Sequence, residues 1–152
     1  MIDREKVVAI FRRMDGYVRQ LRLMASKPRE QIIDDPVNFA ATEHFLQLCV
    51  ESCIDVANHI ISAMRYRAPA DYADAFAVLA ENQIVPGELL TRLQAMARFR
   101  NLIVHLYWEI DAGRVYDILQ NHLEDFQEFE DRVLELIQED TPYGTTDSNR
   151  HQ

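Results

Sequence analysis

Apolar residues recur at steps of three and four along much of this chain, and such a stripe is typical of one face of an α-helix. Residues 36–67 carry apolar side chains on two faces, which predicts a long helix packed against more than one neighbour. Helix breakers are scarce, with 4 glycines and 5 prolines among 152 residues. The first stripe, within residues 3–25, consists of Val7, Ile10, Phe11, Met14, Val18, Leu21 and Met24. The spacing therefore predicts an all-α protein.

The remaining segments complete a bundle. A shorter helix is predicted over residues 71–82, and Pro86 suits the first turn of the helix that follows. Residues 114–138 carry a heptad-like apolar stripe and are predicted to form one long last helix. We therefore expect a four- to five-helix up-and-down bundle in a single domain over residues 1–140. The polar residues 141–152 are expected to form a flexible tail.

The formal net charge of -9 argues at first against a nucleic-acid partner. The charge is unevenly distributed, however. Residues 1–108 hold 13 acidic and 13 basic residues, whereas residues 109–140 hold 11 acidic residues and two arginines. A surface elsewhere on the protein can therefore be locally positive. The acidic last helix can be a solvated face that keeps the protein soluble, can repel RNA, or can dock a basic partner.

Several classes of protein are disfavoured by what the sequence lacks. It contains no apolar run of 18 residues, and its charged N-terminus does not resemble a signal peptide, so no membrane association is expected. Cys49 and Cys53 are spaced as two small buried side chains of one helix rather than as a disulfide, which indicates a reducing, cytoplasmic setting. No phosphate-binding glycine loop and no metal-ligand cluster occurs, so we expect neither cofactor nor metal.

Residues 100–107 read Arg-Asn-Leu-Ile-Val-His-Leu-Tyr and combine side chains suited to phosphodiester chemistry. His105 can transfer a proton near neutral pH. Arg100 carries a permanent planar cation that matches phosphate oxygens. Asn101 lies four residues before His105, on the same helix face, and could hold either His105 or a phosphate oxygen. Taken alone, His105 could equally be a satisfied histidine at a helix end or in the core.

Helical geometry limits how these side chains can cooperate. Arg100 and His105 are separated by about 140° around a regular helix, and His105 and Tyr107 by about 160° in the other sense. One straight helix therefore cannot direct all three at one point. Either the helix loosens near His105, or two chains contribute to one site, as in a two-fold dimer that pairs this helix with its mate.

A second pair of polar residues lies within the long helix over residues 36–67. Asp55 and His59 are four residues apart and can meet. Asp55 could orient or charge His59 in a catalytic pair, or the two could form a polar contact at a helix or subunit interface. Two ligands are too few for a typical zinc site.

The motif and its surroundings resemble the HEPN superfamily, and within it the HepT-type toxins. Arg100, His105 and Tyr107 form the R-x4-H-x-Y pattern of that family. Further similar positions, in order, are Leu46-Gln47-Leu48, the stretch 54–61, Pro69, Tyr72, Phe76, Leu79 and the stretch 96–101. The resemblance covers roughly residues 3 to 138. It departs from the family at His44, where an arginine would be expected.

This resemblance implies a metal-independent endoribonuclease, the toxin of a HepT/MntA-type toxin–antitoxin pair that acts on tRNA or mRNA. RNA supplies its own 2′-hydroxyl nucleophile, so His105 would serve as general base or acid and Arg100 would stabilise charge. In the catalytic interpretation drawn above from the residues, Asn101, Asp55 and His59 would support the site. The resemblance further implies a homodimer, and a partner nucleotidyltransferase that transfers AMP from ATP onto Tyr107.

A hypothesis from another class is a non-catalytic helical module that binds a nucleotidyltransferase or a nucleotide. The overall acidity of the chain favours it slightly. RNA cleavage in EDTA by the wild type but not by His105→Ala would separate the enzyme from the binding module.

Overall fold

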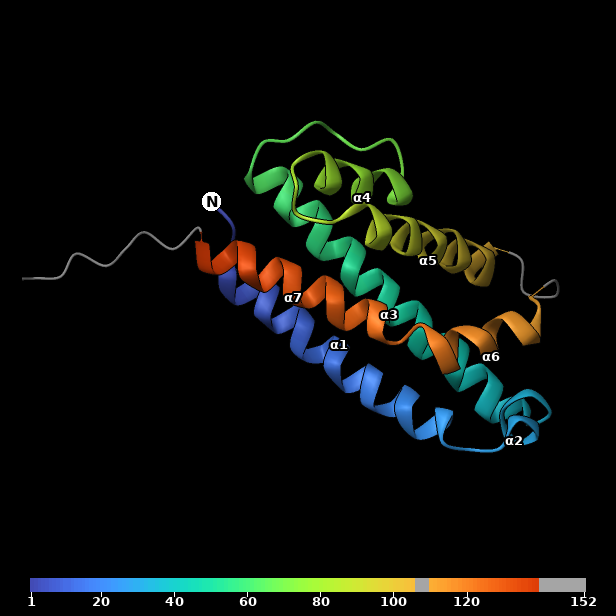
Figure 1. Cartoon of the computed structure of the whole chain (residues 1–152). Coiled ribbons are helices and arrows are strands. Elements are labelled where there is room, and N and C mark those ends of the chain that lie inside the picture. The colour runs from blue at the N-terminus through green and yellow to red at the C-terminus, as the bar shows by residue number, and fades with distance from the viewer. Residues whose placement is uncertain (106–109, 140–152) are drawn as a thin grey trace, which may run out of the picture.

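The computed structural model describes residues 1–105 and 110–139, and within these ranges every regular element is an α-helix (Figure 1). The predicted all-α class is thereby confirmed. The helices are α1 (Arg4–Ala25), α2 (Arg29–Ile33), α3 (Pro36–Ala63), α4 (Tyr72–Glu81), α5 (Gly87–His105), α6 (Ala112–Asn121) and α7 (Glu124–Glu139). Tyr107 and the predicted tail lie outside the described residues.

The long helix α3 runs through the middle of the bundle and contacts each of the other six helices (Figure 1). This arrangement confirms the prediction that its two apolar faces pack against more than one neighbour. Phe129 of α7 meets Phe11 of α1 and Phe76 of α4 edge to face, with ring centroids 6.1 and 5.6 Å away. One buried cluster includes side chains from all seven helices.

Aspartates set the starts of four helices. The carboxylates of Asp3, Asp35, Asp71 and Asp111 each accept a hydrogen bond from a backbone N–H of the first turn. Pro36 follows Asp35 directly and suits the first turn because that position needs no backbone N–H. These caps explain why the observed starts lie within a residue or two of the predicted ones.

The predicted single helix over residues 114–138 is wrong, because the chain turns at His122 and Leu123 and forms two helices, α6 and α7. At the turn, the N–H of His122 donates to Ile118 and that of Asp125 donates to His122. The break lets the two halves pack differently: α6 contacts α1, α2 and α3, whereas α7 contacts α3 and α5 and reaches α1 and α4 through Phe129.

Two further expectations concern burial and membranes. Cys49 and Cys53 are buried free thiols, and burial raises the pKa of the Cys49 thiol to about 12. This agrees with their interpretation as small core residues. No helix in the described part of the chain is long and apolar enough to cross a membrane.

One buried carboxyl makes the stability of this bundle depend on pH. Glu130 of α7 is 7% exposed, and its Oε2 has no hydrogen-bond partner among the described residues. Burial first, and then the neighbouring Asp15 of α1, raise the pKa of Glu130 above its ordinary value. The folded state therefore favours the protonated form, which the unfolded chain loses above about pH 4.3.

We predict that the free energy of unfolding falls as the pH rises above that value, until the raised pKa of Glu130 is passed. Glu130→Gln keeps a neutral side chain of similar shape, so it should be more stable than the wild type at pH 9 by about 2 kcal/mol and nearly equal to it at pH 4. Urea unfolding at both pH values measures this. The exposed Glu135→Gln on the same helix is the control; an equal effect of both substitutions would contradict the prediction.

Candidate functional site

Arg100 of α5 is held by two neighbouring helices. Its Nε and Nη2 donate hydrogen bonds to Oε1 of Glu51 on α3, at 3.0 and 2.9 Å. Its guanidinium carbon lies 5.1 Å from the ring centroid of Tyr72, the first residue of α4. The Arg100 side chain is 16% exposed. Because a guanidinium stays protonated in proteins, these contacts fix a permanent cation just below the surface.

Glu51 is itself embedded in a row of polar side chains along α3. Gln47, one turn earlier, donates from Nε2 to Oε1 of Glu51 at 3.0 Å. Asp55, one turn later, is exposed. Its pKa is raised, mainly by partial desolvation of its carboxylate and secondly by the negative charge of Glu51. Arg100 therefore lies beside an acidic row that holds it by hydrogen bonds and charge.

His105 is the last residue of α5 and is exposed. The helix stays regular up to this residue, so His105 and the partly buried Arg100 project from different sides of it. Nη1 of Arg100 donates to Oδ1 of Asn101 at 3.2 Å, so Asn101 is joined to Arg100 rather than to His105. Among the described residues, Asn101 is thus hydrogen-bonded to Arg100, and no hydrogen bond joins His105 to either of them.

Asp55 and His59 are not hydrogen-bonded to each other in the described part of the chain. Nε2 of His59 instead accepts a hydrogen bond from the backbone N–H of Asp3 at 2.9 Å, which ties the start of α1 to α3. Burial first, and then the cation of Lys6, lower the pKa of His59, which favours the neutral ring that this contact needs. For His59 the polar-contact interpretation fits the geometry. A supporting role of either residue in catalysis stays a prediction.

Sequence reasoning did not single out Glu51, which the structure places against Arg100. A sequence signal did exist: Glu51 is a charged residue within a largely apolar helix, four residues before Asp55. Its partner, however, lies 49 residues further along the chain. In the described part of the chain, no three His, Cys, Asp or Glu side chains are grouped so that they could hold a metal ion.

Residues 14–133 match the family described as Ribonuclease HepT-like, and the chain belongs to that family. The resemblance found in the sequence is thereby confirmed.

Two curated relatives are similar over part of their length. The chain is 41% identical over 88 residues to the mRNA nuclease HepT of Shewanella oneidensis. The matched segment covers 58% of this chain and 66% of that protein. It is 33% identical over 75 residues to the tRNA nuclease HepT of Aphanizomenon flos-aquae, covering 49% and 51%. The matched segments thus span about half to two-thirds of these relatives.

A solved structure shares the fold over nearly its whole length. It is the tri-AMPylated Shewanella oneidensis HEPN toxin in complex with its MNT antitoxin, with a TM-score of 0.80 and 29% identity. The match covers 85% of this chain and 96% of the toxin. The expected HEPN-type bundle is therefore confirmed.

Proposed function

We propose that this protein is a metal-independent endoribonuclease, the toxin of a toxin–antitoxin pair. The observation that carries the proposal is the arrangement on α5, where the R-x4-H pattern of the family presents an exposed His105 and an Arg100 fixed by Glu51 and Tyr72. The relatives support the substrate class, since one is named an mRNA nuclease and the other a tRNA nuclease.

The chemistry needs few protein groups because RNA carries its own nucleophile. The 2′-hydroxyl attacks the adjacent phosphorus, the bond to the 5′-oxygen breaks, and a cyclic phosphate remains. His105 takes the hydroxyl proton or gives a proton to the leaving oxygen. Arg100 stabilises the negative charge that develops on the phosphate oxygens, and its fork is already oriented by Glu51.

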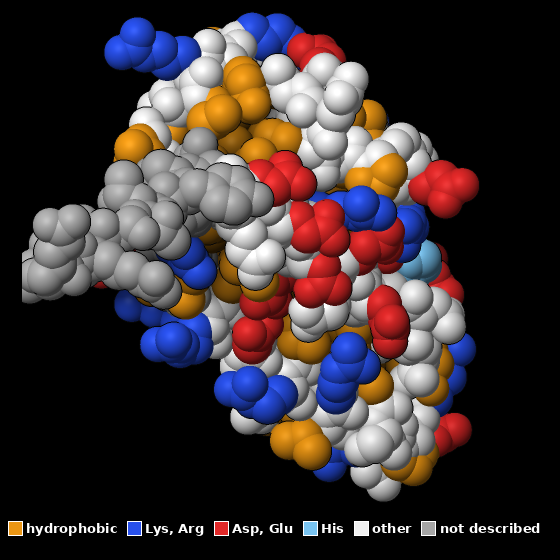
Figure 2. All heavy atoms as spheres, turned by 60° about the vertical axis from the view of Figure 1, so that its left-hand side comes forward, with side chains coloured by type: hydrophobic (Ala, Val, Ile, Leu, Met, Phe, Trp, Pro, Cys, Tyr) orange, Lys and Arg blue, Asp and Glu red, His pale blue; other side chains and the backbone are white. Residues whose placement is uncertain are grey.

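The charge distribution favours an approach of RNA along α5. Figure 2 shows a face on which Asp and Glu side chains gather, with Lys and Arg side chains around them. Exposed acidic residues of α7, among them Asp131 and Glu135, would repel a phosphate backbone. The exposed side of α5 instead carries Arg98 together with His105. We place the protein in the cytoplasm, in keeping with its two free thiols.

We further propose a homodimer in which two chains complete each site. Since α5 is regular up to His105, His105 and Arg100 of one chain project from different sides, and a two-fold axis beside this helix end would bring His105 toward the partner's Arg100. Leu102, an apolar residue that is 37% exposed on the same side as His105, suits such an interface.

A mixed dimer tests the shared site. We predict that Arg100→Ala and His105→Ala homodimers are both inactive, whereas a heterodimer of the two variants, isolated through two different tags, regains about half of the wild-type activity. Half is expected because one of the two sites then holds both native residues. A heterodimer as inactive as its parents, or a monomer by light scattering at micromolar concentration, would contradict the shared site.

The partner of this toxin would be a nucleotidyltransferase antitoxin. The similar Shewanella oneidensis toxin was solved in complex with an MNT antitoxin and in a tri-AMPylated form. We propose that a cognate enzyme of that class transfers AMP to Tyr107 of this chain and silences it.

A further inference from the structure

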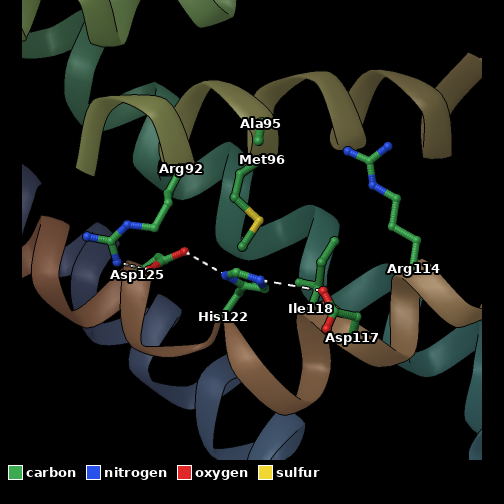
Figure 3. Close-up of a pocket in the computed structure, with 8 residues that line it drawn as sticks. All are labelled: Arg92, Ala95, Met96, Arg114, Asp117, Ile118, His122 and Asp125. Atoms are coloured by element: carbon green, nitrogen blue, oxygen red, sulfur yellow. Dashed lines mark hydrogen bonds and ion pairs between the residues drawn. The ribbon is translucent and has the colours of Figure 1, made fainter. Parts of the chain in front are cut away.

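A cavity of about 210 Å³ lies between α5 and the junction of α6 with α7 (Figure 3), and neither Arg100 nor its partners Glu51 and Tyr72 line it. None of its residues takes part in the proposed chemistry. Its lining consists of Arg92, Ala95 and Met96 from α5, Arg114, Asp117 and Ile118 from α6, His122 from the turn and Asp125 from α7.

The cavity is lined by a buried carboxylate, one oxygen of which accepts no hydrogen bond from the described residues. The Asp125 side chain is 4% exposed, and one of its oxygens accepts a hydrogen bond from Arg92. The other oxygen, Oδ2, is buried without a hydrogen-bond partner among the described residues, and it makes an ion-pair contact with Nδ1 of His122 at 3.4 Å (Figure 3). A buried carboxylate oxygen without a donor is costly, and a carboxylate oxygen can accept more than one hydrogen bond. An N–H group of a ligand in the cavity would remove that cost.

The other walls define the shape and charge of such a ligand. Met96 points from α5 into the cavity, and Arg92 and Arg114 stand at its opposite ends (Figure 3). Arg92 is already paired with Asp125 and Glu128, whereas the guanidinium of Arg114 is exposed and lies over the ring of Phe99, 5.6 Å from its centroid. The two arginines and two aspartates of the lining cancel in formal charge. The cavity therefore suits a neutral, partly apolar group rather than a cation.

We propose that this cavity binds a nucleobase of the RNA substrate, with guanine as the best complement. Guanine offers two adjacent donors, N1–H and the N2 amino group, and carboxylates commonly accept from base amino groups. Asp125 Oδ2 would accept from this edge, Met96 and Ile118 would contact the ring, and Arg114 would hold a neighbouring phosphate. Met96 lies nine residues before His105, about 14 Å along the helix, so a base bound here is not beside the His105 of the same chain.

This inference takes its ligand class from the proposed function, but binding can be measured without cleavage. We would label the methionine methyl groups with ¹³C and titrate the full-length protein with 2′-O-methyl tetranucleotides of sequence UUGU, UUAU, UUCU and UUUU, which lack the nucleophile. The Met96 methyl signal should shift on addition of UUGU, with an affinity about tenfold above that for the other three.

Two variants make the test specific. Asp125→Asn replaces the free acceptor with an amide that can donate, so it should lose the preference for UUGU. Ala95→Leu fills the cavity from an exposed position of α5 and should weaken binding of UUGU about tenfold without touching any charge. Glu128→Gln is the control, because it also removes a partner of Arg92 but does not line the cavity, and it should keep the preference.

The outcomes separate this inference from the proposed function. Suppose the wild type cleaves RNA, but the Met96 signal does not shift with any of the four oligonucleotides, or Asp125→Asn keeps the preference for UUGU. The proposal that the cavity binds a base is then overturned, and the proposed nuclease activity is not affected. If Met96 responds as expected and the wild type cleaves nothing, the cavity stands and the nuclease is overturned. A response of Met96 to a lysine- and arginine-rich peptide and to none of the RNAs would make the cavity a protein-docking site and overturn the inference.

Discussion

His105→Ala should lower the rate of RNA cleavage at least about 100-fold and abolish toxicity, because a general acid–base group contributes that much or more. The side chain is exposed at the end of α5, so its removal leaves no cavity in the core and the thermal unfolding midpoint should stay within about 1 °C. Initial rates on a fluorogenic RNA, with circular dichroism melts alongside, measure both effects. His44→Ala, which removes another exposed histidine, is the control and should keep wild-type activity.

Arg100→Ala should cause a loss of similar size, since it removes the cation that stabilises the transition-state charge. The control is Arg132→Ala, which removes an exposed arginine of α7 and should keep wild-type activity. Arg100→Lys keeps the charge but cannot make both hydrogen bonds to Glu51, so it should recover only a small part of the activity.

EDTA should leave the wild-type rate unchanged. Full activity in His105→Ala would sink the mechanism, and a wild type that binds its partner but cuts no RNA would favour the non-catalytic module.

The fold could be predicted because the signals that determine it are local. Helical periodicity located the amphipathic segments, and an aspartate or proline marked most of their starts. The division between α6 and α7 escaped prediction for a physical reason. Ile118, Leu119, His122 and Phe126 follow one another at steps of one, three and four, so the apolar stripe continues in phase across the turn. The spacing of apolar residues indicates which face of a helix is buried, but it does not indicate where the helix axis changes direction.

Only the part of the candidate site that lies on a single helix could be predicted from the sequence. Arg100 and His105 were identified from their chemistry and spacing, whereas the contact of Arg100 with Glu51 depends on how α3 packs against α5. Asp55 and His59 show the opposite limit. Their spacing permits a contact, but His59 accepts a hydrogen bond from the backbone of Asp3, a partner 56 residues away in sequence. The spacing of two residues along a helix shows whether their side chains can make contact, and the packing of the helices determines whether they do.

Tyr107→Phe should keep most of the ribonuclease activity and escape silencing by the partner nucleotidyltransferase. The proposed modification joins AMP to the phenol oxygen with release of pyrophosphate from ATP, and it places a phosphodiester anion two residues from His105. That anion can pair with the cation of Arg100 and occupy the position of the substrate phosphate, which would lower activity at least about 100-fold. Phenylalanine lacks the oxygen that accepts AMP but keeps the ring.

Co-expression with the partner, followed by intact-mass and peptide mass spectrometry, decides between modification and simple packing of this tyrosine. The wild type should gain one or more adenylate groups on Tyr107 and lose RNA cleavage, and Tyr107→Phe should gain none and stay active. Tyr116→Phe is the matched control, since Tyr116 is a partly buried tyrosine of α6 that contacts Arg29, and it should be modified and silenced like the wild type. Adenylate groups mapped to another residue, or a Tyr107→Phe variant that is still silenced, would show that Tyr107 is not the acceptor.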